Sequence, residues 1–436
     1  MNKKACLCVL VLAGFCTACS APSLRYKTDV NKLTAQGKFE NAAQHITSKE
    51  GKMYAKKDKH LYALDKAVLL HDAHQPRESD NLLSLAQNRI DELYTQSVTA
   101  TVGTLVLNDL TLSYRVDDYE QAFTYFYRMM NFWEQGDVSS AAVEARKAVF
   151  FLDNLRGQKK KGYNDDPFIQ YVASLAFESV GQISDARIAR QNALNGYQKA
   201  SGNVQTPYFP VPQNVNDLGE VIIFHYNGLM PLKTSQTLQL AWDKAMSIAS
   251  SPKETNQEVA PEVQNAVYAG VMGNAITISF PKLEKQHYWV TSSMAVVGGQ
   301  QYPLTAVADL ERLAFDTLEE QMPAIWFRTV TRAVVKRIAA VQARAAAKEA
   351  SKDDTVGELA GMIVSFLGAV TEKADTRQWF TLPAQIYMTR LFLPAGKQDI
   401  SLFLKDQNGN IIKEYTFEDV VIKRGDRVFL HYRSAF

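Results

Sequence analysis

Cysteine is missing from almost the whole chain. The four cysteines among the 436 residues are Cys6, Cys8, Cys16 and Cys19, and none follows. If the chain is cleaved before Cys19, the mature protein keeps one thiol and cannot form a disulfide within itself. Its fold must then depend on an apolar core, which a chain of this length with 46% hydrophobic residues can build.

A surplus of basic charge is also missing. The chain has 48 Lys and Arg against 46 Asp and Glu, and two of the lysines precede Cys19. A near-neutral chain lacks the positive surface of a dedicated nucleic-acid binder, so we expect no nucleic-acid partner. Three consecutive lysines at 159–161 stand between Gly157 and Gly162, and this composition predicts a solvated turn.

The common catalytic motifs do not occur either. The chain has no Gly-x-Ser-x-Gly elbow, Walker loop, dinucleotide fingerprint or His-Glu-x-x-His zinc motif. His71 and His74 are weak candidates for metal ligands, because they lie one helical turn apart with Asp72 between them. Gln75 and Pro76 follow and favour a solvated turn between helices. We therefore predict no enzyme and no cofactor, and keep a metal-dependent hydrolase as the weaker alternative.

The N-terminus has the pattern of an export signal. Two lysines precede an apolar run at 5–15 that is too short to cross a bilayer. The small residues Thr17 and Ala18 then stand directly before Cys19. This order of basic, apolar and small residues predicts cleavage at Cys19.

The same segment resembles a bacterial lipoprotein signal, which implies that residues 1–18 are removed and that Cys19 carries a covalent lipid. Residues 19–28 are the expected tether, and Ser20 favours sorting to the outer membrane. Cys16 departs from the pattern, since such signals usually carry an aliphatic residue there, and plain secretion is the alternative. We expect a protein anchored to the outer membrane on its periplasmic face.

Residues 29–200 predict a helical domain with a recurring pattern. A glycine turn follows an aromatic-rich helix, and alanines follow the glycine at fixed distances: Gly37 with Ala42, Gly136 with Ala141, Ala145 and Ala148, and Gly181 with Ala186 and Ala193. The pattern resembles tetratricopeptide (TPR) repeats, although the two clearest units are farther apart than the usual repeat of about 34 residues. We predict a TPR-like array of helical hairpins, with Trp133, Gly136 and Gly181 as structural or partner-binding residues.

The second half predicts an α+β domain, so the fold class is α+β in two parts. Residues 201–218 read as a linker, 219–383 as strands followed by two long helices, and 384–436 as an antiparallel β segment that packs with 219–300. Pro323 is a candidate break in the first long helix. The second helix, 356–373, is expected to pack internally, with membrane contact as the alternative.

The stretch that joins the helices to the last strands carries three candidate residues. We expect Asp375 and Arg377 to form a structural ion pair and Trp379 to close the base of the sheet. A different interpretation gives the C-terminal sheet a glycan or peptidoglycan site built from exposed Tyr288, Trp289 and Trp379.

Five longer stretches together resemble one family, the uncharacterised TPR-like bacterial envelope lipoproteins with an α+β C-terminal half. The stretches are 117–149, 165–187, 219–233, 322–336 and 374–396. The resemblance implies the architecture and the envelope location, and it associates the chain with small lipoproteins that include activators of cell-wall synthases. We therefore predict a non-enzymatic scaffold or assembly factor for an envelope complex, whose protein partner the sequence does not name.

Overall fold

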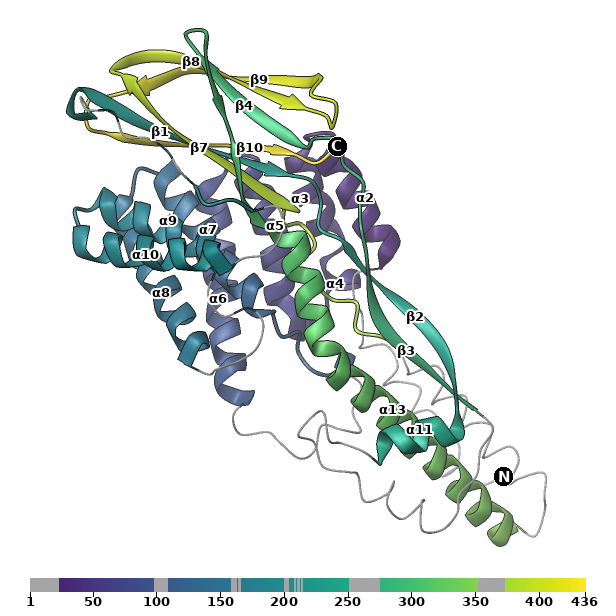
Figure 1. Cartoon of the computed structure of the whole chain (residues 1–436). Coiled ribbons are helices and arrows are strands. Elements are labelled where there is room, and N and C mark those ends of the chain that lie inside the picture. The colour runs from purple at the N-terminus through teal and green to yellow at the C-terminus, as the bar shows by residue number, and fades with distance from the viewer. Residues whose placement is uncertain are drawn as a thin grey trace.

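The computed structural model describes residues 23–97, 109–157, 163, 166–199, 204–207, 209, 212, 215–250, 275–351 and 373–436. The predicted signal, Cys19, the lysine run and nearly all of the helix predicted at 356–373 lie outside these residues. The fold is α+β in two parts, as predicted: helices come first, and sheets with one very long helix follow (Figure 1).

The first part is a helical array built mainly from four antiparallel hairpins. Its helices are α2 (Leu24–Ala35), α3 (Phe39–Ser48), α4 (Glu50–Met53), α5 (Lys59–Asp72), α6 (Pro76–Ser97), α7 (Asp118–Glu134), α8 (Val138–Gly157), α9 (Pro167–Ser179) and α10 (Ile183–Lys199). The array begins within the predicted tether, because the Ser23 hydroxyl accepts a hydrogen bond from the Tyr26 amide and starts α2 at Leu24.

Three of the four hairpin turns contain the predicted glycines. Gly37, Gly136 and Gly181 have φ of +71°, +75° and +72°, a left-handed conformation that glycine adopts without strain. At each turn the amide after the glycine donates to a carbonyl five residues earlier. The fourth turn, between α5 and α6, has the same hydrogen bonds but places His74 at the left-handed position, with φ of +56°.

The alanines that follow these glycines are buried, as the pattern predicts. Ala141, Ala145 and Ala148 of α8 expose none of their surface, and the equivalent alanines of α3 and α10 are also buried. Small side chains at these positions let the second helix of each hairpin lie close to the first. The repeat pattern therefore encodes both the turn and the packing distance.

The second part contains two four-stranded sheets. Strands β10 (Arg427–Ser434), β1 (Leu218–Asn227), β7 (Gln385–Pro394) and β6 (Thr305–Asp309) form the helix-facing sheet in that order. Strands β5 (Gln300–Pro303), β4 (Ser292–Val297), β8 (Gly396–Lys405) and β9 (Ile411–Ile422) form the outer sheet.

The sheets and the helical array form three layers. Alternate residues of β1 point to opposite faces, so Ile222 and Phe224 pack in one core with the helices, whereas Val221 and Ile223 pack in a second core against the outer sheet. In Figure 1 the two sheets lie above the helices. The largest apolar core thus contains side chains from both parts of the chain.

The last four strands do not form one antiparallel sheet, which corrects the prediction for 384–436. Strands β7 and β10 join the helix-facing sheet, and β8 and β9 join the outer sheet. Strand β10 runs parallel to β1, with Ile222 opposite Phe429. The sequence predicted the strands and their turns, but a turn at Gly425 leads from one sheet to the other here and does not close a hairpin.

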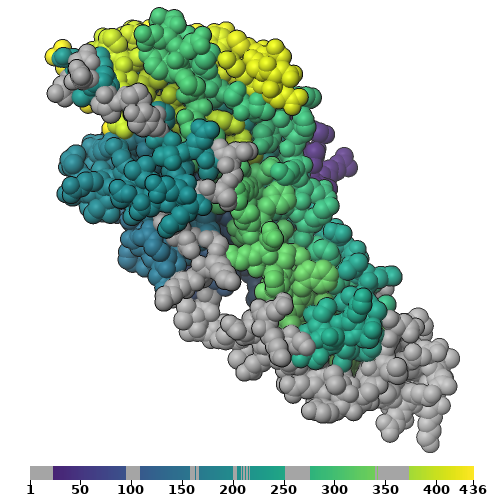
Figure 2. Space-filling view, viewed as in Figure 1, coloured from purple at the N-terminus to yellow at the C-terminus, as the bar shows by residue number. Residues whose placement is uncertain are grey.

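An arm extends from the body. It consists of the hairpin β2 (Leu232–Ala241) and β3 (Ala275–Glu284), the helix α11 (Trp242–Ala249) and the outer part of α13 (Leu310–Ser351) (Figures 1 and 2). These elements share a small core of their own, which includes Trp242, Ile278 and Val334.

Pro323 does not break the long helix. Helix α13 is continuous from Leu310 to Ser351, with the proline inside it. Leu310 and Ala314 pack in the main core before the proline, and Val330 packs in the arm core after it. Packing at both ends therefore compensates for the backbone hydrogen bond that proline cannot make.

Residues 373–384, here called the buried connector, run from the arm into the body. Two carboxylates of the array accept hydrogen bonds from its backbone amides. Glu120 Oε1 accepts from the Trp379 amide at 2.8 Å, and Asp65 Oδ1 accepts from the Phe380 amide at 3.1 Å. Lys27 Nζ donates to the Thr376 carbonyl at 2.7 Å. The protein's own chain therefore covers the face of the array that carries Lys27, Asp65 and Glu120.

Arg377 forms the ion pair with Asp375 that the sequence predicted. Its Nη2 donates to Asp375 Oδ2 at 2.6 Å, and its Nη1 donates to both oxygens of Asp58 at 3.0 Å. Asp58 comes from the array, so the pair also joins the two parts of the chain. Trp379 is fully buried beside Tyr127, as expected of a residue that closes the base of the sheet.

Within the described residues, none of the helices combines the length and the apolar character that crossing a membrane requires.

Candidate functional site

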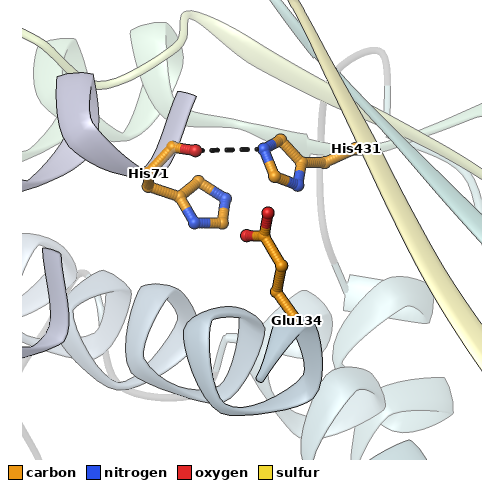
Figure 3. A group of neighbouring side chains, drawn as sticks. All are labelled: His71, Glu134 and His431. Atoms are coloured by element: carbon orange, nitrogen blue, oxygen red, sulfur yellow. Dashed lines mark hydrogen bonds between the residues drawn. The ribbon is translucent and has the colours of Figure 1, made fainter. Parts of the chain in front are cut away.

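Three histidines meet where the helical array contacts β10. His71 lies in the last turn of α5, His74 lies in the α5–α6 turn and His431 lies on β10, while Glu134 is the last residue of α7. Figure 3 shows His71, Glu134 and His431 pointing toward one another from three separate elements. The structure therefore adds two groups to the histidine pair that the sequence singled out.

The rings are stacked. His431 lies 4.1 Å from His71 between ring centroids, with 19° between the planes, and 4.6 Å from His74. His431 Nε2 lies 3.2 Å from the His71 carbonyl oxygen, to which it donates, and His74 Nδ1 lies 2.9 Å from Glu134 Oε1. The predicted solvated corner is correct for His74, which is exposed, and wrong for His71, which is fully buried.

Hydrogen bonds from α6 and α7 fix the tautomer of His71. Its Nδ1 donates to Asn131 Oδ1 at 2.7 Å, and Asn131 Nδ2 donates to Ser79 Oγ at 2.9 Å. Ser79 Oγ donates to the Ala67 carbonyl at 2.8 Å, so its lone pair faces Asn131. The Nε2 of His71 is left as the acceptor, and the Tyr226 hydroxyl lies 3.3 Å from it.

Burial and neighbours give the three histidines different proton affinities. Burial lowers the pKa of His71 to about 4 and that of His431 well below its usual value, to which the neighbouring His71 and His74 contribute. The hydrogen bond to Glu134 raises the pKa of His74. Near neutral pH two neutral rings therefore stack beside a third that readily takes a proton.

The arrangement does not favour one shared metal ion. His71, Glu134 and His431 each offer a ligand atom, and these atoms all lie within 4.8 Å of one another. A metal bound by an imidazole lies about 2.1 Å from the nitrogen and near the ring plane. Two almost parallel rings stacked 4.1 Å apart offer no point that satisfies both. The cluster is built for stacking, and a metal-dependent hydrolase gains no support from it.

A cavity of about 570 Å³ opens beside the histidines. Three segments line it: the α2–α3 turn at 34–41, the α5–α6 turn at 72–74, and residues of β9, β10 and the C-terminus, namely Lys413, Tyr415, His431, Tyr432, Arg433, Ala435 and Phe436. Its size is typical of a small-molecule site. The cavity is therefore the main candidate for ligand binding on this side of the protein.

Asp72 and Arg433 line this cavity and are both more than nine-tenths buried. Arg433 Nε lies 3.9 Å from Asp72 Oδ2, which is too long for a hydrogen bond. Both Asp72 oxygens, and Nε and Nη1 of Arg433, have no hydrogen-bond partner among the described residues, so the two side chains face each other as a loose buried ion pair. Burial raises the pKa of Asp72 to about 7, so its negative charge is partly lost at neutral pH.

The other predicted site residues are structural. Trp133 stacks on Phe429 of β10, with 3.8 Å between ring centroids, and Gly136 and Gly181 form hairpin turns. Trp379 is fully buried, which corrects its assignment to an exposed glycan site.

The two remaining aromatics of the glycan interpretation lie in the β3–β4 loop. The ring of Tyr288 lies where a Cβ on Gly228 would stand, so it covers the backbone there. Trp289 is 62% exposed and is the one member of the set that fits a surface site.

No local sequence pattern marks the residues that complete the cluster. His431 lies 360 positions from His71, and nothing in the pattern of β10 distinguishes it from an ordinary strand residue. Glu134 ends an aromatic-rich helix, where a carboxylate reads as a surface residue. A detectable signal was His74 itself, a side chain in a turn where the other three hairpins have glycine.

No protein-family model matches the chain, and no curated protein matches it significantly. The resemblance to TPR-like envelope lipoproteins therefore stays a prediction.

Proposed function

We propose that the protein is a lipoprotein anchored to the outer membrane through Cys19, and that it binds a protein partner in the periplasm without catalysing a reaction. The observation that carries the proposal is a set of apolar side chains on the outer face of the array. Leu85 of α6, Val143 and Phe150 of α8, and Ile183 and Ile188 of α10 are exposed.

A TPR-like array would ordinarily bind a partner in its groove, but here the protein's own strands and connector occupy that side. The outer face is therefore the proposed binding surface. Helices α5 and α7 contact β10, and the buried connector fills the adjoining space. The second helices α6, α8 and α10 carry the exposed apolar side chains named above, and in Figure 1 α6 and α8 lie farther from the sheet than α7 and α9. Apolar side chains grouped on one layer of helices favour a protein surface as their partner.

The test is position-specific cross-linking in cells. A photoreactive residue replaces Phe150 or Ile188, and the control replaces Ile411 of β9, which is also an exposed apolar side chain. We expect one discrete protein adduct from positions 150 and 188 and none of that size from 411. Equal adducts from all three positions would contradict a binding role for the outer helix face.

The anchor has its own test. A Cys19→Ala variant is expected to be released from membranes by the gentle washing that leaves the parent protein bound, because the lipid would no longer hold it. Mass spectrometry of the parent N-terminus should find an acylated cysteine. An unmodified Cys19, or a Cys19→Ala variant that stays in the membrane fraction, would contradict the proposed lipid anchor.

A further inference from the structure

We propose that the free edge of β10 binds an extended segment of a protein partner, which joins the helix-facing sheet as an additional strand beside β10. The segment has apolar and polar side chains at alternate positions. This surface is separate from the outer helix face of the proposed function, so the inference goes beyond that function.

Strand β10 has unpaired backbone groups on the side away from β1. It is the last strand of its sheet and pairs in parallel with β1 in an unbroken register. In such a pair, successive residues turn their amides and carbonyls alternately toward the neighbouring strand and away from it. The Ser434 carbonyl accepts from the Gly228 amide at 2.8 Å, so Ser434 faces β1. The odd-numbered residues therefore face the free edge, and those within the strand are Phe429, His431 and Arg433.

These backbone groups have no partner within the part of the chain that the structure describes. No hydrogen bond joins the amide or the carbonyl of Phe429, His431 or Arg433 to another described residue. His431 and Arg433 are nevertheless buried, at 5% and 4% exposed. Buried backbone groups are nearly always paired in folded proteins. An extended backbone is the partner that matches this edge, because its own amides and carbonyls recur at the same spacing.

The β10 edge also lacks two features that keep strand edges from pairing. The strand contains no proline, and its register with β1 has no bulge. Strand β9, the edge of the outer sheet on the same side, differs. Its register with β8 shifts beside Asp419, which has a φ of +52°, and such a bulge turns an edge away from a new neighbour. Of the two edges, β10 is therefore the one suited to pairing.

A trough follows the β10 edge along the strand. The cavity of about 570 Å³ is lined by residues 431–433, and a second cavity of about 500 Å³ is lined by Val428 and Leu430. Tyr415 of β9 lines both cavities, so they adjoin. In Figure 1 the C-terminus, which follows β10, lies close to α2 and α3, whose connecting turn forms the far wall of the first cavity. The trough thus has the place and direction of a missing strand.

The two faces of the trough differ in polarity. The face toward the outer sheet is mainly apolar, with Tyr415, Phe417, Val428 and Leu430. The face toward the helices is mainly polar, because it consists of the turns at 34–41 and 72–74. Side chains of an added strand point alternately to these two faces. The bound segment therefore alternates apolar residues, which extend the second core, with polar ones.

The shape of the trough favours a single segment over a second copy of this chain. Residues of the α2–α3 turn and of β9 line the cavity beside β10 together. In a second copy the same walls would flank its own β10. Two such recessed edges cannot approach to the spacing of about 4.8 Å that paired strands need.

The experiment selects binding peptides and then locates them on the protein. Phage-displayed random peptides of about twelve residues, enough to cover the eight residues of β10, are selected against the full chain. We expect the enriched peptides to alternate apolar and polar residues. Hydrogen–deuterium exchange with the best peptide should slow the amides of Phe429, His431 and Arg433 roughly tenfold or more, since these amides become paired.

A peptide control leaves the protein unchanged, so its result does not depend on how a variant folds. The same peptide, N-methylated at every second amide, cannot donate to the β10 edge and should lose saturable binding. A pair of protein variants tests the apolar wall. Leu430→Glu should weaken binding roughly tenfold, whereas Ile411→Glu, an exposed position of β9 that lines neither cavity, should leave it unchanged.

Four results would overturn the inference: no enriched peptide, equal binding of the N-methylated peptide, slowed exchange only outside β10, or equal binding by Leu430→Glu and the parent. Exchange at β10 that slows with rising protein concentration and needs no peptide would assign the edge to a second copy, which also contradicts the proposal. Cross-linking at positions 150 and 188 probes a different surface, so the two proposals can fail separately.

Discussion

Single residues at the junction of β10 with the helices have their charge states set by burial. His71 and His431 are neutral where they stack, whereas His74, one turn away, is drawn toward the charged state by Glu134. Asp72 of α5 and Arg433 of β10 lie on the same elements, and burial raises the pKa of Asp72. A fall in pH therefore changes the protonation of specific side chains at this junction.

Acid should weaken the fold through His71 and His431. An unfolded histidine has a pKa near 6.5, and the folded value for His71 is about 4. Because the folded pKa is depressed, protons bind the unfolded chain first, and stability falls as pH falls from about 6.5 toward 4. The loss is about 1.4 kcal/mol per pH unit for His71 inside that window, and the depressed pKa of His431 acts in the same direction.

The measurement compares urea unfolding at pH 7, 6 and 5 for the parent and for His431→Phe. Phenylalanine keeps the stack on His71 but cannot take a proton, so the variant should lose less stability between pH 7 and pH 5 than the parent loses. The exposed His287, changed to Gln, is the control and should follow the parent. Parallel pH profiles for the parent and His431→Phe would contradict the assignment.

Individual elements were predictable where a local pattern specifies them. The hairpins follow from glycine turns and alanine spacing, and α9 begins at Pro167 after Asp166 caps the Ile169 amide. Strand β2 was missed because its residues are polar and half of it is exposed, and α11 was missed because it is short. Both elements pack on the arm core, where α11 buries Trp242, Ala245 and Ala249.

The candidate site was less predictable than the elements. The sequence identified His71, His74, Asp375 and Arg377, each by its neighbours along the chain. It could not identify Asp58, Glu134 or His431 as their partners, because each comes from a different element and meets the others only in the folded protein. Contacts between distant elements are encoded in packing, not in local spacing.

Replacing the turn glycine of one hairpin should destabilise the protein without any steric clash. A Cβ at Gly136 would meet no atom within 4 Å, so Gly136→Ala acts through its backbone φ of +75° alone. We expect a loss of about 1 kcal/mol. Gly51→Ala is the matched control, because Gly51 also has open space but lies in a helix, where alanine is preferred by roughly 0.5–1 kcal/mol. Thermal unfolding should shift in opposite directions, and a Gly136→Ala protein as stable as the parent would refute the argument.

At the scale of the whole molecule, one apolar core joins the two parts. Its members include Tyr26 of α2, residues throughout the array, Trp379 of the buried connector and Met388 of β7. Arg390 and Arg427 of the sheet also pair with Glu178 of α9 and with Glu220 of β1. The array and the helix-facing sheet are therefore expected to unfold together.

Breaking the buried ion pair should lower the stability of both parts at once. Arg377→Gln leaves Asp58 and Asp375 without their cation, and removal of one partner from a buried pair costs roughly 3–5 kcal/mol. Arg424→Gln is the control, because its pair with Asp217 is exposed and contributes about 0–1 kcal/mol. Urea unfolding followed by tryptophan fluorescence and by far-ultraviolet circular dichroism should give one coincident transition for each protein. Two separate transitions, or an Arg377→Gln protein as stable as the control, would contradict a shared core.

The position of β1 between β10 and β7 has a consequence for synthesis. Residues that emerge early must wait for partners encoded near the end of the chain, since β1 pairs with residues 385–394 and 427–434. Until those strands and the outer-sheet strands between them arrive, Val221 and Ile223 lack most of the side chains that cover them in the second core. The nascent protein is thus a natural client for chaperones, and a nonsense codon shortly before Arg427 would produce a protease substrate, not a shortened stable protein.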